Sequence, residues 1–164
     1  MSIFEKSLQK MRMDTTQVYE NMQVTPLFLD IPGNKDYLIL DEAIKQKVAK
    51  IMEVSEGGNV PELKFDNSSA FSILLLDGEE LIGAKQNRIV NLTILVGPER
   101  TISIPVSCVE AGRWQHKSRE FETTERALYS KVRASKARHV SESMKHSDSR
   151  ESDQGDLWGH IRAK

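Results

Sequence analysis

Short β-prone runs separated by tight turns fill the middle of this 164-residue chain and limit the folds it can adopt. Between residues 62 and 110 the runs are ELKF, AFSILLL, EELIG, IVNLTILV and TISIPVSCV, and the links are DNSS, DG, AKQNR and GPER. Links this short join neighbouring antiparallel strands, whereas parallel strands need a much longer crossover. The sequence therefore predicts an antiparallel β-sheet or sandwich core over about residues 62–110.

The link formed by Asp77 and Gly78 is a specific turn signal. Both residue types tolerate the positive φ angles of a tight primed turn, and apolar runs stand on either side. This pair predicts a β-hairpin.

Helical patterns flank the predicted core, so the expected fold class is α+β. Asp41 is a candidate N-cap for a helix over about residues 41–51, and a second helical pattern covers about residues 123–145. Residues 1–13 fit either a short amphipathic helix or a frayed terminus. Residues 147–155 are polar and are predicted to be a flexible linker, and residues 1–164 are treated as a single domain.

The charge balance excludes some classes of partner. The net charge is −1, which gives the whole molecule no electrostatic reason to bind nucleic acid or an acidic membrane. Residues 111–140 differ, with eight Lys/Arg against three Glu. This basic segment is a candidate binding surface for a partner protein, although it also fits a solvated helix face.

Cys108 is the only cysteine, so no internal disulfide and no cysteine-based zinc site can form. It lies inside an apolar strand pattern and is predicted to be buried and unreactive. The histidines are too far apart in sequence to suggest a metal site, and no glycine-rich phosphate loop occurs, so no cofactor is expected. The chain lacks a signal-peptide pattern and any run near the roughly 20 apolar residues of a membrane helix, so a cytoplasmic setting is expected.

A dense polar block interrupts the most hydrophobic part of the chain. Burying such side chains costs several kcal/mol unless they are paired, so they either form a satisfied network or hold a polar ligand. An arginine fork suits a carboxylate or phosphate, and amides suit sugar hydroxyls or a base edge. The candidate ligand-binding residues of this block are Glu79, Glu80, Lys85, Gln86, Asn87, Arg88 and Asn91.

A second polar block, with Glu110, Arg113 and Trp114, follows the next long strand pattern. Antiparallel neighbours with short links would bring both blocks to one edge of the sheet, where Arg88 and Arg113 could bind an anionic group. The alternative is an internal salt-bridge network that fixes strand register.

The strings LLLDGEELIGAKQNRIVN and IPVSCVEAGRW resemble the ADP-ribosylglycohydrolase- and rhodanese-phosphatase-superfamily-associated protein domain, once catalogued as a domain of unknown function. The specific part covers about residues 71–114, and weaker similarity extends over most of the chain. Family members continue beyond the tryptophan that matches Trp158, so the chain is expected to be a short member or a fragment of a longer protein.

The resemblance implies a role in ADP-ribose metabolism, and the first hypothesis is a domain that binds ADP-ribose or a related nucleotide-derived ligand. The alternatives are a hydrolase acting on an ADP-ribose derivative, with Glu79, Glu80 or Glu110 as general base, and a protein-interaction scaffold. Because Glu79 and Glu80 are adjacent in a predicted strand, they are expected to point to opposite faces of the sheet.

Overall fold

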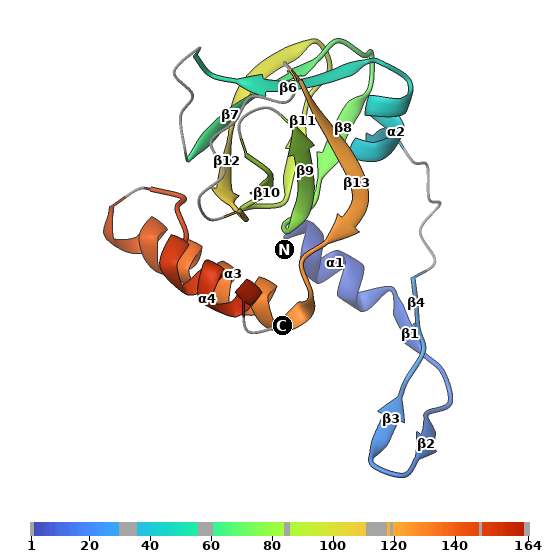
Figure 1. Cartoon of the computed structure of the whole chain (residues 1–164). Helices are drawn as coiled ribbons and strands as arrows, with labels where there is room; N and C mark the ends of the chain where they lie inside the picture. Colours follow the sequence, from blue (N-terminus) through green and yellow to red (C-terminus); the bar gives the residue numbers. More distant parts are fainter. Residues whose placement is uncertain are drawn as a thin grey trace. The chain divides into compact units, whose positions relative to one another are not determined.

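The computed structural model describes residues 2–29, 36–55, 61–83, 86–110, 118, 120–147 and 149–162. The chain divides into two compact units, Met1–Lys35 and Asp36–Lys164. The treatment of the chain as one domain therefore stays a prediction, and each unit is described by itself. Figure 1 shows the elements of both units.

The first unit consists of a short helix and a long two-stranded ribbon. Helix α1 (Ile3–Gln9) confirms the helical alternative for residues 1–13, and Ser2 and Glu5 cap it reciprocally. The Ser2 hydroxyl accepts the Glu5 N–H at 3.2 Å, and the Glu5 carboxylate accepts the Ser2 N–H at 2.6 Å. Strand β1 (Met11–Met13) pairs with β4 (Leu27–Leu29), and β2 (Gln17–Tyr19) pairs with β3 (Met22–Val24), both antiparallel.

A six-stranded, wholly antiparallel sheet forms the main part of the second unit and confirms the predicted class, α+β with an antiparallel core. The sheet curls into a half-barrel, and its two edge strands approach each other at a bridge between Met52 and Glu120. Lys50 also pairs with Glu120 at 3.2 Å. In spatial order the strands are β13 (Phe121–Ala127), β9 (Glu79–Gly83), β10 (Arg88–Val90), β12 (Arg100–Cys108), β7 (Glu62–Asn67) and β6 (Ala49–Glu53).

A smaller sheet completes the core. Strand β8 (Ser72–Leu75) is central, with β11 (Ile94–Val96) antiparallel on one side and β5 (Tyr37–Ile39) parallel on the other. Alternate residues of β7 and β8 are buried, as expected for strands with one face on a core. The fully buried apolar side chains come from both sheets and include Leu63, Phe65, Ile73, Leu75, Leu81 and Ile104.

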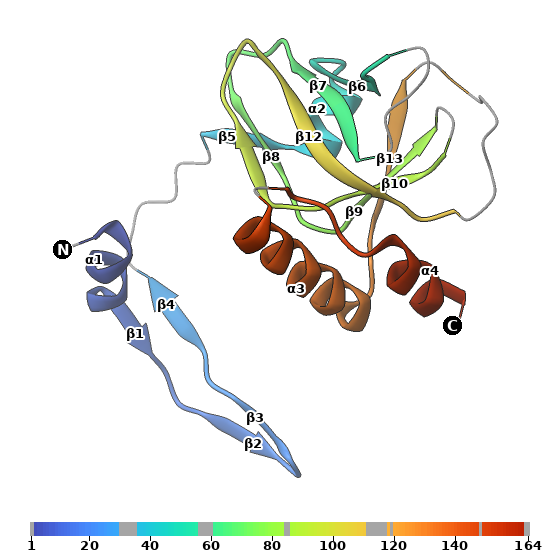
Figure 2. The same ribbon diagram turned by 90° about the vertical axis from the view of Figure 1, so that its left-hand side faces the viewer.

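Helices α3 (Ser130–His146) and α4 (Gln154–Arg162) lie side by side against the outer face of the six-stranded sheet (Figure 2). Ile89 of β10 packs there against Val132 and Leu157, in a cluster separate from the main core. No helix in the described residues is long and apolar enough to cross a membrane. Residues 149–153 precede α4 without forming helix or strand, and the flexibility expected of residues 147–155 stays a prediction.

The helix predicted over residues 41–51 is wrong in its second half. Helix α2 (Leu40–Lys45) ends early, because Lys47 takes the left-handed conformation with φ of 59°. Strand β6 then begins at Ala49, and Ala49 and Ile51 enter the core as alternate strand residues. The spacing of Ala49 and Ile51 fits the apolar side of a helix or of a strand. The strand forms because this segment pairs with β7.

The helix predicted over residues 123–145 is wrong at its start. Residues 121–127 form β13, which pairs with β9, and the helix begins at Ser130. Phe121 anchors the strand in the core, and the β-branched Thr123 and Thr124 suit a pleated surface. At Glu125, where φ is 56°, the register with β9 shifts.

The hairpin predicted at Asp77 and Gly78 is also wrong. The turn forms, and Gly78 has the expected positive φ of 84°. Its flanking strands do not pair, because β8 belongs to the smaller sheet and β9 to the larger one. The Gly78 N–H donates instead to the Val90 carbonyl at 2.9 Å, so the turn lies where the two sheets separate.

Candidate functional site

Gln86, Arg88 and Cys108 form a buried polar cluster inside the curled sheet. Arg88 lies opposite Cys108 of β12 and opposite Leu81 of β9. The side chains of Arg88, Cys108 and Leu81 therefore all point to the interior of the sheet. Arg88 Nη1 donates to Gln86 Oε1 at 2.9 Å and to Cys108 Sγ at 2.7 Å. Arg88 is 0% exposed, and these contacts hold its guanidinium against protein atoms.

Burial also controls the chemistry of Cys108. The thiol is 2% exposed, which confirms the predicted burial. Desolvation raises the pKa of Cys108 and outweighs the opposing effect of the Arg88 charge. A thiol with a raised pKa gives little thiolate at neutral pH, so the position disfavours nucleophilic chemistry.

Asn87 and Glu110 connect the two polar blocks. The Asn87 backbone N–H donates to Glu110 Oε2 at 3.1 Å, and the Val109 N–H donates to the Asn87 carbonyl at 3.2 Å. Gln86 Nε2 donates to the Glu110 carbonyl at 3.1 Å. The described parts of the two blocks therefore meet where β10 begins and β12 ends.

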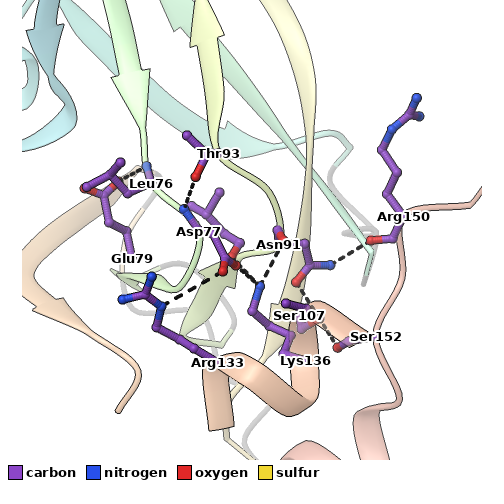
Figure 3. Close-up of polar contacts among 12 residues, drawn as sticks. Leu76, Asp77, Glu79, Asn91, Thr93, Ser107, Arg133, Lys136, Arg150 and Ser152 are labelled. Atoms are coloured by element: carbon purple, nitrogen blue, oxygen red, sulfur yellow. Dashed lines mark hydrogen bonds and ion pairs between the residues drawn. The ribbon is translucent and has the colours of Figure 1, made fainter. Parts of the chain in front are cut away.

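Asn91, at the opposite end of β10, belongs to a different network (Figure 3). Its side chain accepts the Ser107 hydroxyl at 2.9 Å and donates to the Arg150 carbonyl at 3.0 Å. Its backbone carbonyl accepts Lys136 Nζ at 2.9 Å. Asn91 thus ties the sheet to α3 and to the segment before α4, away from Asn87.

Lys136 is the buried cation of that network. Its ammonium donates to the Asp77 carboxylate and, at 3.1 Å, to the Val90 carbonyl. Desolvation lowers the pKa of Lys136, and the Asp77 carboxylate opposes that shift. Arg133 Nε lies 4.0 Å from the same carboxylate, so Asp77 joins α3 to the turn between the sheets (Figure 3).

Glu79 and Glu80 lie at the start of β9 and border one cavity of about 250 Å³, although they were expected to face opposite sides. Glu79 Oε2 accepts the Leu76 N–H at 2.9 Å, and Glu80 Oε2 accepts the Thr124 hydroxyl at 3.0 Å. Desolvation raises the pKa of Glu79. The strand begins at this point, so both side chains can reach the cavity at its end.

A second cavity of about 390 Å³, termed here the polar-rimmed cavity, brings together three of the residues singled out in the sequence. Glu80, Asn87 and Glu110 line it together with Arg126 and Tyr129, and these five residues are called its rim here. Aliphatic side chains supply the rest of its lining: Ile89, Val109, Ala127, Leu128 and Ile161.

Sequence reasoning missed Arg126 and Tyr129 as site residues. Both stand in the stretch that was predicted to be one helix, where Arg126 counted only as part of the basic segment. The Tyr129 hydroxyl donates to the His160 carbonyl at 3.0 Å and so joins the rim to α4. Lys85, Arg113 and Trp114 lie outside the described residues, so the proposed meeting of Arg88 with Arg113 stays a prediction.

Two histidines face one carboxylate between α3 and α4. His139 Nδ1 lies 3.8 Å from Asp156 Oδ2, and His160 Nε2 lies 3.5 Å from Asp156 Oδ1. Ser135 also donates to Asp156 at 2.8 Å. Within the described ranges, no group of His, Cys, Asp and Glu side chains is arranged to hold a metal ion.

A model of a known family matches most of the chain. Residues 10–164 match the family model described as "ARG and Rhodanese-Phosphatase-superfamily-associated Protein domain". The description associates that family with the ADP-ribosylglycohydrolase and rhodanese-phosphatase superfamilies. Neither the curated proteins nor the solved structures contain a match.

Proposed function

The chain belongs to the ARG and Rhodanese-Phosphatase-superfamily-associated Protein domain family, and on that basis we propose that it binds ADP-ribose or a related nucleotide-derived ligand in the polar-rimmed cavity. The single observation that carries this proposal is the composition of the cavity. Its lining combines aliphatic side chains with one arginine, two carboxylates, an amide and a phenol ring. Ligand sites commonly pair an apolar surface with a few convergent polar groups in this way.

Each part of such a ligand has a suitable counterpart on the rim. Arg126 is exposed and offers the planar donor fork that suits a phosphate group. Glu80 and Glu110 can accept hydrogen bonds from ribose hydroxyls, and the Asn87 amide can both donate and accept. A base can lie on the aliphatic lining beside the Tyr129 ring.

The volume of the cavity supports a ligand of this class. About 390 Å³ falls within the roughly 300–1,000 Å³ typical of small-molecule sites.

The buried cluster of Gln86, Arg88 and Cys108 also supports the site. Gln86 bonds both Arg88 and the Glu110 backbone, so it holds the Asn87–Glu110 edge of the cavity in place.

A hydrolase acting on an ADP-ribose derivative is the second candidate. The observation that favours it is the pair formed by Glu79 and Glu80, which border one cavity. Burial raises the pKa of Glu79, which suits its carboxyl to donate a proton. Glu80 also borders the polar-rimmed cavity, so it is within reach of a ligand bound there.

Calorimetric titration of the protein with ADP-ribose, NAD and AMP tests the binding proposal. Arg126→Ala should weaken binding of the preferred ligand by tenfold or more, equivalent to about 1.4 kcal/mol. Arg138→Ala is the matched control, because Arg138 is an exposed arginine of α3 that does not line the cavity. If none of these ligands binds the wild-type protein, the proposal is wrong.

Product analysis by chromatography separates the binding protein from the hydrolase. A binding protein leaves ADP-ribose intact on long incubation. A hydrolase converts it, and Glu79→Gln should abolish conversion while the affinity for ADP-ribose is kept, because Glu79 does not line the polar-rimmed cavity. Unchanged conversion by this variant would exclude Glu79 as the proton donor.

A further inference from the structure

The N-terminal arm, residues 2–29, exposes an unusual amount of apolar surface. None of its described side chains is buried, and most of the large apolar ones are 42–72% exposed. Ten side chains belong to this set: Phe4, Leu8, Met13, Val18, Tyr19, Met22, Val24, Leu27, Phe28 and Leu29.

Strand pairing gathers these side chains on common faces. In the outer part of the ribbon Tyr19 lies opposite Met22, and Val24 lies on the same face two residues along. In the inner part Met13 lies opposite Leu27 on another apolar face. Each strand also has one edge that is unpaired within the described residues, and such an edge is a template for a further strand.

The arm has no core of its own to stabilise it. A two-stranded hairpin is at best marginally stable in water, and chains below about 40 residues usually need a metal, a disulfide or a partner. The family match begins at residue 10, so both ladders of the ribbon belong to the family domain. Large exposed apolar patches on soluble proteins commonly mark binding interfaces.

We propose that this surface pairs with the arm of a second copy of the chain, in an antiparallel arrangement about a two-fold axis. The proposal is independent of the ligand proposed above. The arm carries three cationic residues (Lys6, Lys10, Arg12) and three anionic residues (Glu5, Asp14, Glu20). A balanced, apolar surface of this kind is poorly suited to nucleic acid or anionic lipid but is compatible with itself.

The area of the arm matches what a dimer needs. Burying one large apolar side chain corresponds to roughly 60–120 Å² at about 25 cal/mol per Å². The ten side chains, which are 42–72% exposed, therefore offer on the order of 350–700 Å² per copy when all of them are buried. Specific interfaces bury about 600–1,000 Å² on each partner, so two arms reach the lower part of this range.

Sedimentation velocity of the full chain tests the proposal. At roughly 100 µM, where a dimer with a Kd of about 1 µM is almost fully associated, the expected mass is twice the 18.6 kDa of one chain. Met22→Lys should give monomers, because it places a charge in the apolar face that pairing would bury. Met144→Lys is the control, since Met144 is an exposed methionine of α3, and this variant should remain dimeric.

Charge variants of both signs distinguish an apolar contact between arms from an electrostatic use of the surface. Met22→Lys and Met22→Glu should each be monomeric, because either charge would be buried against the apolar face of the partner arm. A wild-type monomer at this concentration overturns the proposal, and so does a Met22→Lys variant that stays dimeric. A Met22→Glu variant that stays dimeric overturns it as well, since the arm would then contact a different surface.

Discussion

Arg88 and Glu53 face each other inside the curled sheet, with Arg88 Nη2 3.9 Å from Glu53 Oε1. Their strands, β10 and β6, are separated in the sheet by β12 and β7, so the contact crosses the interior. The two side chains are 0% and 11% exposed. Neither carboxylate oxygen of Glu53 accepts a hydrogen bond from the described residues, so the Arg88 charge is its principal compensation.

Removing only one member of this ion pair should therefore lower the stability of the protein. Arg88→Met should destabilise the protein by about 3–5 kcal/mol, because it leaves the Glu53 carboxylate buried without a counter-charge. The double variant Arg88→Met with Glu53→Leu should recover most of that loss, since apolar side chains of similar size can replace a buried pair. Urea unfolding of the single and double variants measures the coupling. Additive losses in the two single variants would show that the ion pair contributes nothing.

Glu79→Gln should affect stability in a pH-dependent way. Burial raises the folded-state pKa of Glu79, so its contribution to stability is fully present below pH 4.5 and is lost as pH rises through the folded pKa. Above that point the charged side chain is a cost that glutamine removes, while its amide oxygen can still accept the Leu76 N–H. The variant should therefore equal or exceed the wild type in stability at pH 7. Thermal melts at pH 4 and pH 7 check this, and lower stability of the variant at pH 7 would contradict it.

Cys108 should react slowly with thiol reagents in the native protein and rapidly once the protein is unfolded. Burial raises its pKa, and Gln154 covers the backbone beside it with hydrogen bonds to both the N–H and the carbonyl of Cys108. Gln154→Ala should speed native labelling, because the cover is loosened. Glu151→Ala, an exposed position in the same segment, should leave the rate unchanged. Labelling with a coloured disulfide reagent gives these rates, and fast reaction of the native wild type would refute the assignment.

Lys136→Met should lower stability by about 2–4 kcal/mol, since it removes the donor from two buried backbone carbonyls. Asp77 keeps Arg133 nearby, which limits the loss. Lys131→Met, at an exposed position of the same helix, should change stability by less than about 0.5 kcal/mol. Urea unfolding monitored by circular dichroism measures both. Equal stability of the Lys136 variant and the wild type would mean that α3 is held by apolar packing alone.

The sequence predicts the β core well and its borders poorly. Alternation in the strands around Leu63 and Phe65 has only one explanation, a sheet with one buried face. Ala49 and Ile51 fit a helix as well as a strand, and only the pairing of β6 with β7 decides between them. Thr123 and Thr124 similarly become strand residues because β9 offers an edge to pair with.

The candidate site could likewise be predicted from the sequence only in part. The density of polar residues around Asn87 indicates a special position, and its contact with Glu110 follows from antiparallel neighbours. The burial of Arg88 depends on Glu53, which lies in a strand that nothing in the sequence connects to it. Arg126 and Tyr129 reach the cavity only because β13 ends beside β9, which local patterns do not reveal.

The hydrogen bonds between Gln154 and Cys108 also have a consequence for synthesis of the chain. The two residues are 46 positions apart, so the ribosome must add that length after Cys108 before the cover can form. At about 5–20 residues per second, this leaves roughly 2–9 s in which the end of β12 has no cap. During that interval the backbone N–H and carbonyl of Cys108 lack the hydrogen bonds that Gln154 later supplies. Until α4 emerges, this end of β12 is therefore open to pairing with another strand.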